Sequence, residues 1–328
     1  FTFGHVRQLD RVLAEALKRA WRAGVGPGAA RLVIDVDSFV GEVHGHDKQG
    51  AGYGYTGELG YHPILATRAD TSEVLHVRQR KGQANTQRGA LRFVDELLAR
   101  VRRAGATGQI VVRADSGFQN KRVCQRLRER GCEYSIGVAL ARHITDLIAQ
   151  IPDQAWQPVL DYPDSGVCEL AETTLAGDRL IVRRVHLAAQ EDQTELFTYW
   201  RHHAFITNRQ ERIHEVDAEH RAHAQVELVI RDLKDQALAH FPSGHYSANS
   251  AWTVIACLAH NLQRWTALLG LADPTPRAAA TIRRRLFALP GRLTRTARRW
   301  TLHLPARWPW QHAFIEALTR IRALPAAA

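Results

Sequence analysis

Hydrophobic residues in the first part of the chain recur with two different spacings. Between residues 7 and 23 they fall on one face of a helix, which a glycine- and proline-rich turn then ends. Residues 31–39 have the pattern of a buried strand that unusually carries two acids. Segments 60–69 and 73–81 are two further strand candidates with a short polar turn between them. The pattern predicts a helix that leads into a three-stranded meander.

From residue 89 onward, helical and strand-like patterns alternate. Residues 89–104 and 119–130 have the period of amphipathic helices, whereas residues 109–115 and 134–138 have the pattern of short strands. A meander followed by alternating helices and strands is typical of an α/β protein. We therefore expect a mixed sheet with helices packed on it.

The character of the chain changes between residues 154 and 207. This segment contains three β-rich stretches separated by turn residues, at 167–175, 179–187 and 195–206. It is typical of a β-rich unit inserted into the α/β core.

Helical periodicity returns at residues 212–239 and 247–270, and an arginine-rich tail follows at 281–310. We therefore expect five segments along the chain. They are an N-terminal helical segment (1–30), the first part of the core (31–153), the β-rich insertion (154–207), the second part of the core (208–270) and a basic C-terminal segment (271–328).

The charge balance favours a polyanionic partner. The chain has 44 Lys and Arg residues against 33 Asp and Glu, with a net charge of +11 and a pI near 10.0. Nucleic acid is the expected partner, although a basic pI also raises solubility without any partner. Basic residues gather around the meander and in the tail, which supports nucleic acid. The meander cluster comprises Lys48, Arg78, Arg80, Lys81, Arg88 and Arg92, and the tail cluster comprises Arg283, Arg284, Arg285, Arg292, Arg295, Arg298 and Arg299.

The cysteines, the apolar runs and the first residues indicate in which cellular compartment the protein is expected. None of the four cysteines belongs to a C-x-x-C pair, so neither a zinc knuckle nor a disulfide framework is indicated. No apolar run reaches the length of a membrane span, and the first residues lack the features of a signal peptide. We expect a soluble, cytoplasmic protein. Because the sequence contains no methionine, we also expect further chain before residue 1.

Four acidic residues are candidates for chemistry, and two of them lie in a strand where burial makes a charge costly. Asp35 and Asp37 lie within the predicted strand 31–39, Asp115 ends a valine-rich strand, and Glu227 lies on a helix among basic residues. A buried carboxylate is expensive unless a cation pairs with it. Carboxylates that converge from separate elements can hold the metal ions of two-metal phosphoryl transfer. Asp35 or Asp37 alone is equally well explained as a salt-bridge partner of an arginine, and Glu227 alone is better explained as a solvated salt-bridge partner of its basic neighbours.

Two sequence blocks are more specific than these single acids. Asp37-Ser-Phe is followed by Val43-His-Gly-His and by Gly50-Ala-Gly-Tyr-Gly-Tyr-Thr-Gly, and residues 113–118 read Arg-Ala-Asp-Ser-Gly-Phe. With these blocks the chain resembles the DDE-type transposases of bacterial insertion sequences, and most closely those of insertion-sequence family 1380. The resemblance covers most of the chain.

A third block of that family is a helix on which Glu precedes Lys by seven positions. Glu227 and Lys234 keep this spacing, whereas His220 and His223 replace the Tyr and Arg of the family pattern. The resemblance implies that Lys234 holds a DNA phosphate near the cut. The predicted DNA contacts are Lys234, Arg221, His223, Arg231 and Lys48.

The resemblance implies a ribonuclease H-like fold, in which helices flank a mixed sheet and a β-rich unit precedes the final catalytic helix. It also implies that Asp37, Asp115 and Glu227 bind two Mg²⁺ ions, which Mn²⁺ can replace, and catalyse DNA strand cleavage and strand transfer. The implied partners are the terminal inverted repeats, target DNA and a second subunit of a homodimer. Asp35 shares a strand face with Asp37 and stays an alternative first acid, although Ser38 makes Asp37 the better fit.

Two other functions stay open. A nuclease of the same fold would cut DNA without joining it, and a catalytically inactive remnant of a mobile element would only bind DNA. The altered positions 220 and 223 favour the remnant, whereas the retained acids argue against it. Metal-dependent cleavage distinguishes an enzyme from the remnant, and strand transfer distinguishes a transposase from the nuclease.

Overall fold

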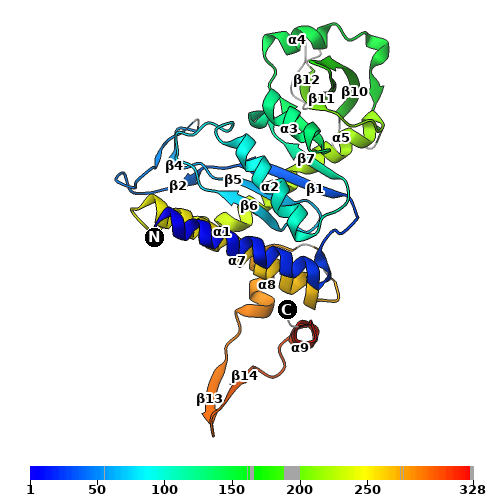
Figure 1. The fold of residues 1–328 in the computed structure, drawn as a ribbon. Coiled ribbons are helices and arrows are strands. Elements are labelled where there is room, and N and C mark those ends of the chain that lie inside the picture. Colours follow the sequence, from blue (N-terminus) through cyan, green and yellow to red (C-terminus); the bar gives the residue numbers. More distant parts are fainter. Residues whose placement is uncertain are drawn as a thin grey trace, which may run out of the picture.

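One large sheet organises the molecule (Figure 1). The computed structural model describes residues 1–54, 56–160, 162, 166–187, 200–273, 275 and 277–325. Among these, nine strands pair in the order β6-β5-β1-β7-β8-β12-β11-β10-β9. The bounds are β1 Leu32–Ser38, β5 Ile64–Arg68, β6 Val74–Arg78, β7 Ile110–Ala114, β8 Glu133–Val138, β9 Gln157–Pro158, β10 Gly166–Leu175, β11 Asp178–Leu187 and β12 Arg201–Thr207.

Helices and two small sheets surround this sheet. The helices are α1 Phe3–Ala20, α2 Ala90–Ala104, α3 Lys121–Glu129, α4 Arg142–Ala149, α5 Ile213–Arg221, α6 Gln225–Lys234, α7 Tyr246–Gly270, α8 Ala279–Ile282 and α9 Gln311–Arg322. The short helical turns are η1 Trp21–Val25, η2 Ser116–Phe118, η3 Asp153–Ala155, η4 Ala222–Ala224, η5 Ala237–Ala239 and η6 Arg283–Phe287. The small sheets are β2 Gly41–Glu42, β4 Leu59–Tyr61 and β3 Gly52–Tyr53, and the hairpin β13 Arg292–Thr296 with β14 Arg299–His303.

The first five strands of the large sheet form the predicted mixed core. β1 pairs antiparallel with β5 and parallel with β7, β5 pairs antiparallel with β6, and β7 pairs parallel with β8. Three antiparallel strands followed by two parallel ones, with α2 and α3 in the connections, make up the ribonuclease H-like arrangement expected from the sequence. The α/β fold class is therefore confirmed.

The β-rich stretches after residue 154 continue the same sheet. β12 pairs antiparallel with β8, and β11, β10 and β9 follow by antiparallel pairing. Alternate residues of β11 point to opposite faces, so that Leu180 and Val182 join the main core while Ile181 packs with Val216 of α5. The first residues of the predicted strand 195–206 lie outside the described part of the chain.

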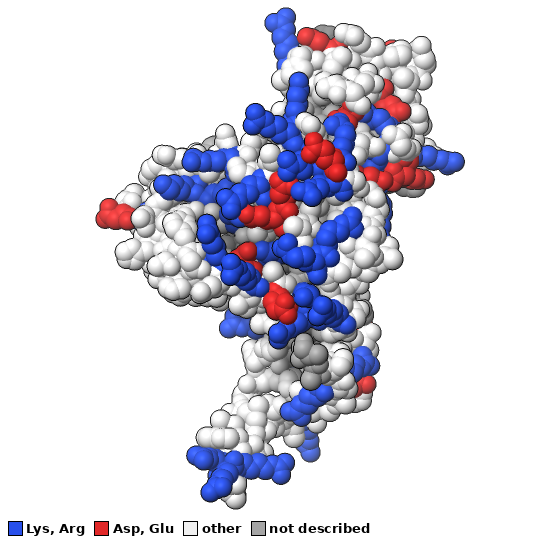
Figure 2. Space-filling model, viewed as in Figure 1, with Lys and Arg blue, Asp and Glu red and all other residues white. Residues whose placement is uncertain are grey.

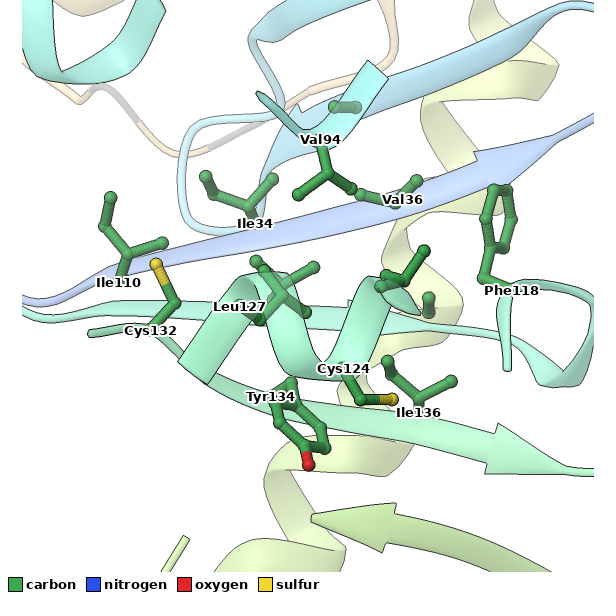
Figure 3. Packing of buried hydrophobic residues seen from close by; sticks show 14 of the residues in the cluster. Ile34, Val36, Val94, Ile110, Phe118, Cys124, Leu127, Cys132, Tyr134 and Ile136 are labelled. Carbon is green, nitrogen blue, oxygen red and sulfur yellow. The ribbon is translucent and has the colours of Figure 1, made fainter. Parts of the chain in front are cut away.

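Alternation along β1 separates a hydrophobic face from an acidic one. Ile34 and Val36 belong to a buried cluster with Val94 of α2, on the side of the sheet that α2 and α3 cover (Figure 3). Asp35 and Asp37 therefore point to the other face, where α6 packs against β1. On that side, α1 and α7 lie next to each other and α7 packs on β6.

Two elements predicted as continuous are interrupted in the structure. The strand expected at 60–69 divides into β4 and β5 around Pro63, whose nitrogen has no hydrogen to give to a neighbouring strand. The helix expected at 212–239 divides into α5, η4 and α6. The break lies where the buried guanidinium of Arg113 donates to the carbonyl oxygens of Glu219 and Ala222, in competition with the helical hydrogen bonds.

Within the described residues, no helix combines the length and the apolar character that crossing a membrane requires.

Candidate active site

Two of the predicted catalytic acids lie at the same edge of the large sheet. Val36 and Ala114 are partners in the parallel pairing of β1 with β7. Asp37 and Asp115 are the residues that directly follow them, so neighbouring parallel strands deliver both carboxylates to one edge. Glu227 approaches from the first turn of α6, the helix that packs against β1. Three acids far apart in sequence thus come from three elements that meet.

Two of these carboxylates, Asp115 and Glu227, act on the third, and His223 partly offsets their charge. In the described part of the chain, none of them forms a salt bridge with a Lys or Arg side chain. Burial raises the pKa of Asp37 to about 6, and the negative charges of Asp115 and Glu227 act in the same direction. The amide of Ser38 donates to Asp37 Oδ1 over 2.6 Å, which lowers the pKa but does not reverse its rise.

Asp115 and Glu227 are more exposed than Asp37. Neighbouring protein atoms nevertheless withdraw part of the Asp115 carboxylate from water and raise its pKa, while His223 and the backbone amides of Gly117 and Phe118 oppose that rise. Among the described residues, no three His, Cys, Asp or Glu side chains are already gathered as ligands of one metal ion. The acids share one end of the sheet but do not converge on a single point.

Asp35 has a different environment from Asp37, although both point to the same face. Asp35 is completely buried, and both its oxygens accept hydrogen bonds from Arg113, over 2.7 and 2.8 Å. His223 Nδ1 lies a further 2.8 Å from Asp35 Oδ1. With its lone pairs occupied by a buried guanidinium and an imidazole, Asp35 has a structural role. This arrangement favours Asp37 as the first catalytic acid.

Arg113, Gly117 and Phe118 of the Arg-Ala-Asp-Ser-Gly-Phe block each have a different structural role. Arg113 ties Asp35 to the break between α5 and α6, and Phe118 is buried in the main core. A β-carbon on Gly117 would lie 2.9 Å from the side chain of Thr86, so this position requires glycine for close approach. The block therefore supports the surrounding fold and presents Asp115 at the surface.

The loop that supplies Thr86 is held by a buried arginine. Arg80 Nε donates to the His62 carbonyl over 2.8 Å, and Nη1 donates to the carbonyls of Asn85, Thr86 and Arg88. Burial lowers the pKa of Arg80 to about 10. Arg80 belongs to the basic meander cluster by sequence, but its side chain is internal and organises this loop.

The same region contains a histidine that the sequence did not single out. His62 is buried, and its Nε2 lies 3.0 Å from Ser38 Oγ, next to Asp37. Burial lowers the pKa of His62, while the charge of Asp115 opposes this shift. The ring is therefore a neutral hydrogen-bonding group beside two of the acids. A lone histidine before Pro63 gave no pattern from which this position could be predicted.

The predicted DNA contacts have unequal surroundings. Lys234 and Arg231 are exposed on α6, and Lys234 Nζ lies 5.5 Å from the centre of the Phe39 ring, just beyond β1. Arg221 Nε donates to Asp217 over 2.9 Å, so this nitrogen is already engaged. Lys48 Nζ donates to the carbonyls of Phe241 and Ser243, over 2.6 and 3.3 Å.

Of these residues, Lys234 and Arg231 therefore remain the most available to a phosphate. His223 is engaged by Asp35 through Nδ1 and presents only its other nitrogen. On the wider surface, Lys and Arg side chains gather over the middle of the face shown in Figure 2, with a few acids among them.

A mixed sheet with acids at the ends of two parallel strands and on the helix across them is the arrangement expected of DDE-type strand-transfer enzymes. The family described as transposase DDE domain, group 1, matches residues 5–326, and the chain belongs to this family.

Among solved structures, the chain is similar to that described as a cryo-EM structure of a piggyBac transposase synaptic complex with hairpin DNA. The TM-score is 0.50 at 11% sequence identity, and the match covers 78% of this chain and 51% of that one. The chain thus spans about half the length of that transposase, and the likeness concerns the fold. A search of curated proteins gave no match.

Proposed function

We propose that the chain cuts DNA strands at the ends of a mobile element and joins them to target DNA, with Asp37, Asp115 and Glu227 as the catalytic acids. Membership of the transposase DDE domain family supports this reaction. The observation that carries the assignment of residues is the meeting of β1, β7 and α6, which brings three unpaired carboxylates to one edge of the sheet.

The carboxylates present fit a divalent cation. Mg²⁺ and Mn²⁺ prefer oxygen ligands, and the three acids offer these without a Lys or Arg partner among the described residues. We assign Asp37, Asp115 and Glu227 as the residues that hold two such ions. In phosphoryl transfer, bound divalent cations supply Lewis acidity and neutralise developing charge.

The protein's own residues then position the DNA. Lys234 lies on the exposed side of α6, two turns after Glu227, and its ammonium suits a phosphate oxygen near the cut. The buried Arg113–Asp35–His223 contacts hold the start of α6 at a fixed place over β1. Positioning of this kind accounts for much of the catalysis of phosphoryl transfer, because little covalent chemistry falls to the protein.

DNA is the proposed substrate and partner, through the terminal inverted repeats and a target duplex. A homodimer is proposed as well, since two element ends must be brought together for joining. The similar piggyBac transposase was solved as a synaptic complex with hairpin DNA, which supports DNA as the partner of this fold.

The test is cleavage and strand transfer on duplexes taken from both flanks of the gene that encodes the chain. Wild-type protein with Mg²⁺ or Mn²⁺ is expected to produce nicked and joined products, and neither is expected in EDTA. Cleavage without joining would identify a nuclease. Binding without any cleavage, at every metal concentration, would identify an inactive remnant and end the proposal.

A further inference from the structure

The hairpin of β13 and β14 has no covering layer among the described residues. Every residue of the two strands is exposed except the half-buried Thr294. Figure 1 shows the hairpin extending away from the sheet and its helices. A two-stranded hairpin is only marginally stable in water on its own, so an isolated pair of strands suggests that another surface completes it.

The charge of this region is strongly one-sided. No Asp or Glu occurs between Asp273 and Glu316. The arginines of this stretch are Arg277, Arg283, Arg284, Arg285, Arg292, Arg295, Arg298, Arg299 and Arg307. Within the described chain, no acid forms a salt bridge with any of the four arginines of the hairpin, and Figure 2 shows basic side chains at its end. Uncompensated guanidinium groups are suited to a polyanion.

The pairing of the two strands gives the hairpin two different faces. Leu293 pairs with Leu302, and Arg295 pairs with Trp300, so these four side chains share one face. The opposite face is entirely polar. It consists of Arg292 with His303, Thr294 with Thr301, and Thr296 with Arg299.

The apolar face is small and partly covered. The guanidinium carbon of Arg295 lies 5.4 Å from the centre of the Trp300 ring, so a charge rests over its largest hydrophobic side chain. Leu293, Leu302 and Trp300 together cannot supply the roughly 1,200 Å² that a stable protein–protein interface buries. A second copy of the chain is therefore the weaker candidate partner.

The dimensions and the turn agree with a duplex groove. Each strand has five residues, or about 17 Å of extended chain, and the major groove of DNA, about 12 Å wide, admits a two-stranded ribbon. Ala297 and Arg298 join the strands with φ values of 47° and 68°, as in the tight turns that preserve the twist of a hairpin. This turn places Arg298 at the tip.

We propose that the β13–β14 hairpin is a second DNA-binding element, which lays its Arg and Thr face into the major groove of a duplex. The inference rests on the proposed function only in taking DNA as the partner. It requires none of the catalytic residues. Arg292 and Arg299 contact phosphates or base edges from opposite ends of the polar face, and the Thr hydroxyls lie between them.

The test compares two double variants of the full chain. Arg292→Gln with Arg299→Gln removes two charges from the polar face. Arg103→Gln with Arg142→Gln removes two exposed arginines from α2 and α4, as a matched control. Binding to a labelled duplex from the gene's flank, and to an unrelated duplex of equal length, is measured over a series of salt concentrations.

The hairpin variant is expected to bind about tenfold more weakly, and the slope of log Kd against log salt should fall by about 2 because two phosphate contacts are lost. The control should change affinity less than twofold, and both variants should keep the wild-type Tm. Equal affinity of the two variants would overturn the inference.

A third variant, Leu293→Gln with Leu302→Gln, distinguishes a protein partner. If it alters the molecular mass in solution while the arginine variant binds DNA normally, the hairpin is a contact between copies and the inference is wrong. These outcomes are independent of cleavage. A wild-type protein that binds through the hairpin but never cuts would defeat the proposed catalysis and leave the inference standing.

Discussion

The two ends of the central strands use acidic residues in opposite ways. At the carboxyl ends of β1 and β7, the charge of Asp115 adds to the burial that raises the pKa of Asp37, and neither acid forms a salt bridge with a Lys or Arg among the described residues. At the other end, Arg209 lies 2.6 Å from Glu211 and 3.0 Å from Glu219. The pKa of Glu211 falls to about 2, chiefly through the hydrogen bond from Arg209.

Arg31, just before β1, belongs to the same paired end and lies 2.9 Å from Glu219. The comparison shows that residue type does not decide the role of an acid in this sheet. Paired acids at one end serve stability, whereas unpaired acids at the other end lower stability and are available to bind a cation.

The largest effect is expected from neutralising an unpaired acid. Asp115→Asn and Glu227→Gln should each reduce DNA cleavage about a thousandfold or more, because each removes a proposed charged oxygen ligand. Folding should not suffer, since the change relieves repulsion within the acidic group. Cleavage rates and Tm measured on the same preparations check both statements. Substantial cleavage by either variant would exclude that acid from catalysis.

The second largest effect is expected on the free energy of unfolding, from the loss of Arg113, which pairs with Asp35 two residues before Asp37 on β1. Arg113→Met should lower the free energy of unfolding by about 3–5 kcal/mol, because the buried Asp35 carboxylate loses its partner. Arg103→Met, at an exposed position of α2, is the control and should change it by about 0.5 kcal/mol at most. Urea denaturation at pH 7 provides the comparison. Similar losses in both variants would contradict the role given to Arg113.

The pH dependence of stability should have opposite signs at the two ends. The pKa of Asp37 rises from an ordinary 3.8 to about 6, so its ionisation opposes folding and stability declines as pH rises between these values. The pKa of Glu211 falls from 4.5 to about 2, so its contribution is present above 4.5 and disappears as pH falls toward 2.

Asp37→Asn should therefore raise Tm at pH 7 in EDTA, and Glu211→Gln should lower it. The Asp37→Asn difference should diminish toward pH 4, and the Glu211→Gln difference should diminish further toward pH 2. Thermal melting from pH 2 to 7 measures both variants. Shifts of the same sign at pH 7 would remove the contrast between the two ends.

The smallest effect is expected on stability, from Arg31, a partly exposed arginine at the end of the sheet where the acids are paired. Arg31→Gln should cost about 0–1 kcal/mol of stability, because partly exposed ion pairs contribute little. Cleavage should be unchanged, since Arg31 lies at the end of β1 away from Asp37. A tenfold loss of cleavage with normal stability would show that the two ends are not separate.

Much of the fold followed from periodicity alone. The strand at 31–39, the helix at 89–104 and the strand at 109–115 were predictable because a strand buried on both sides and an amphipathic helix leave strong local patterns. The break in the helix expected at 212–239 was not predictable. It depends on Arg113, about a hundred residues earlier in the chain, whose guanidinium reaches the carbonyl of Glu219.

In the candidate site as well, the features that depend on contacts between distant residues could not be predicted from the sequence. Asp115 was found through a contiguous block, and Asp37 through a carboxylate within an apolar strand. Whether Asp35 or Asp37 was free could not be decided from sequence, because the answer depends on Arg113 and His223 reaching Asp35 in space. The placement of His62 beside Ser38 likewise depends on the pairing of β1 with β5.

Under the proposed function, the different roles of the residues at 113–118 predict how inactive copies of the mobile element would look in a genome. Arg113 and Phe118 are buried and support the fold, whereas Asp115 is exposed and makes no salt bridge with Lys or Arg in the described structure. A copy that loses transposition but still yields a folded protein is free to change at Asp115 while it keeps the residues around it. Such decayed copies should be recognisable by an otherwise intact block with a substitution at this one position.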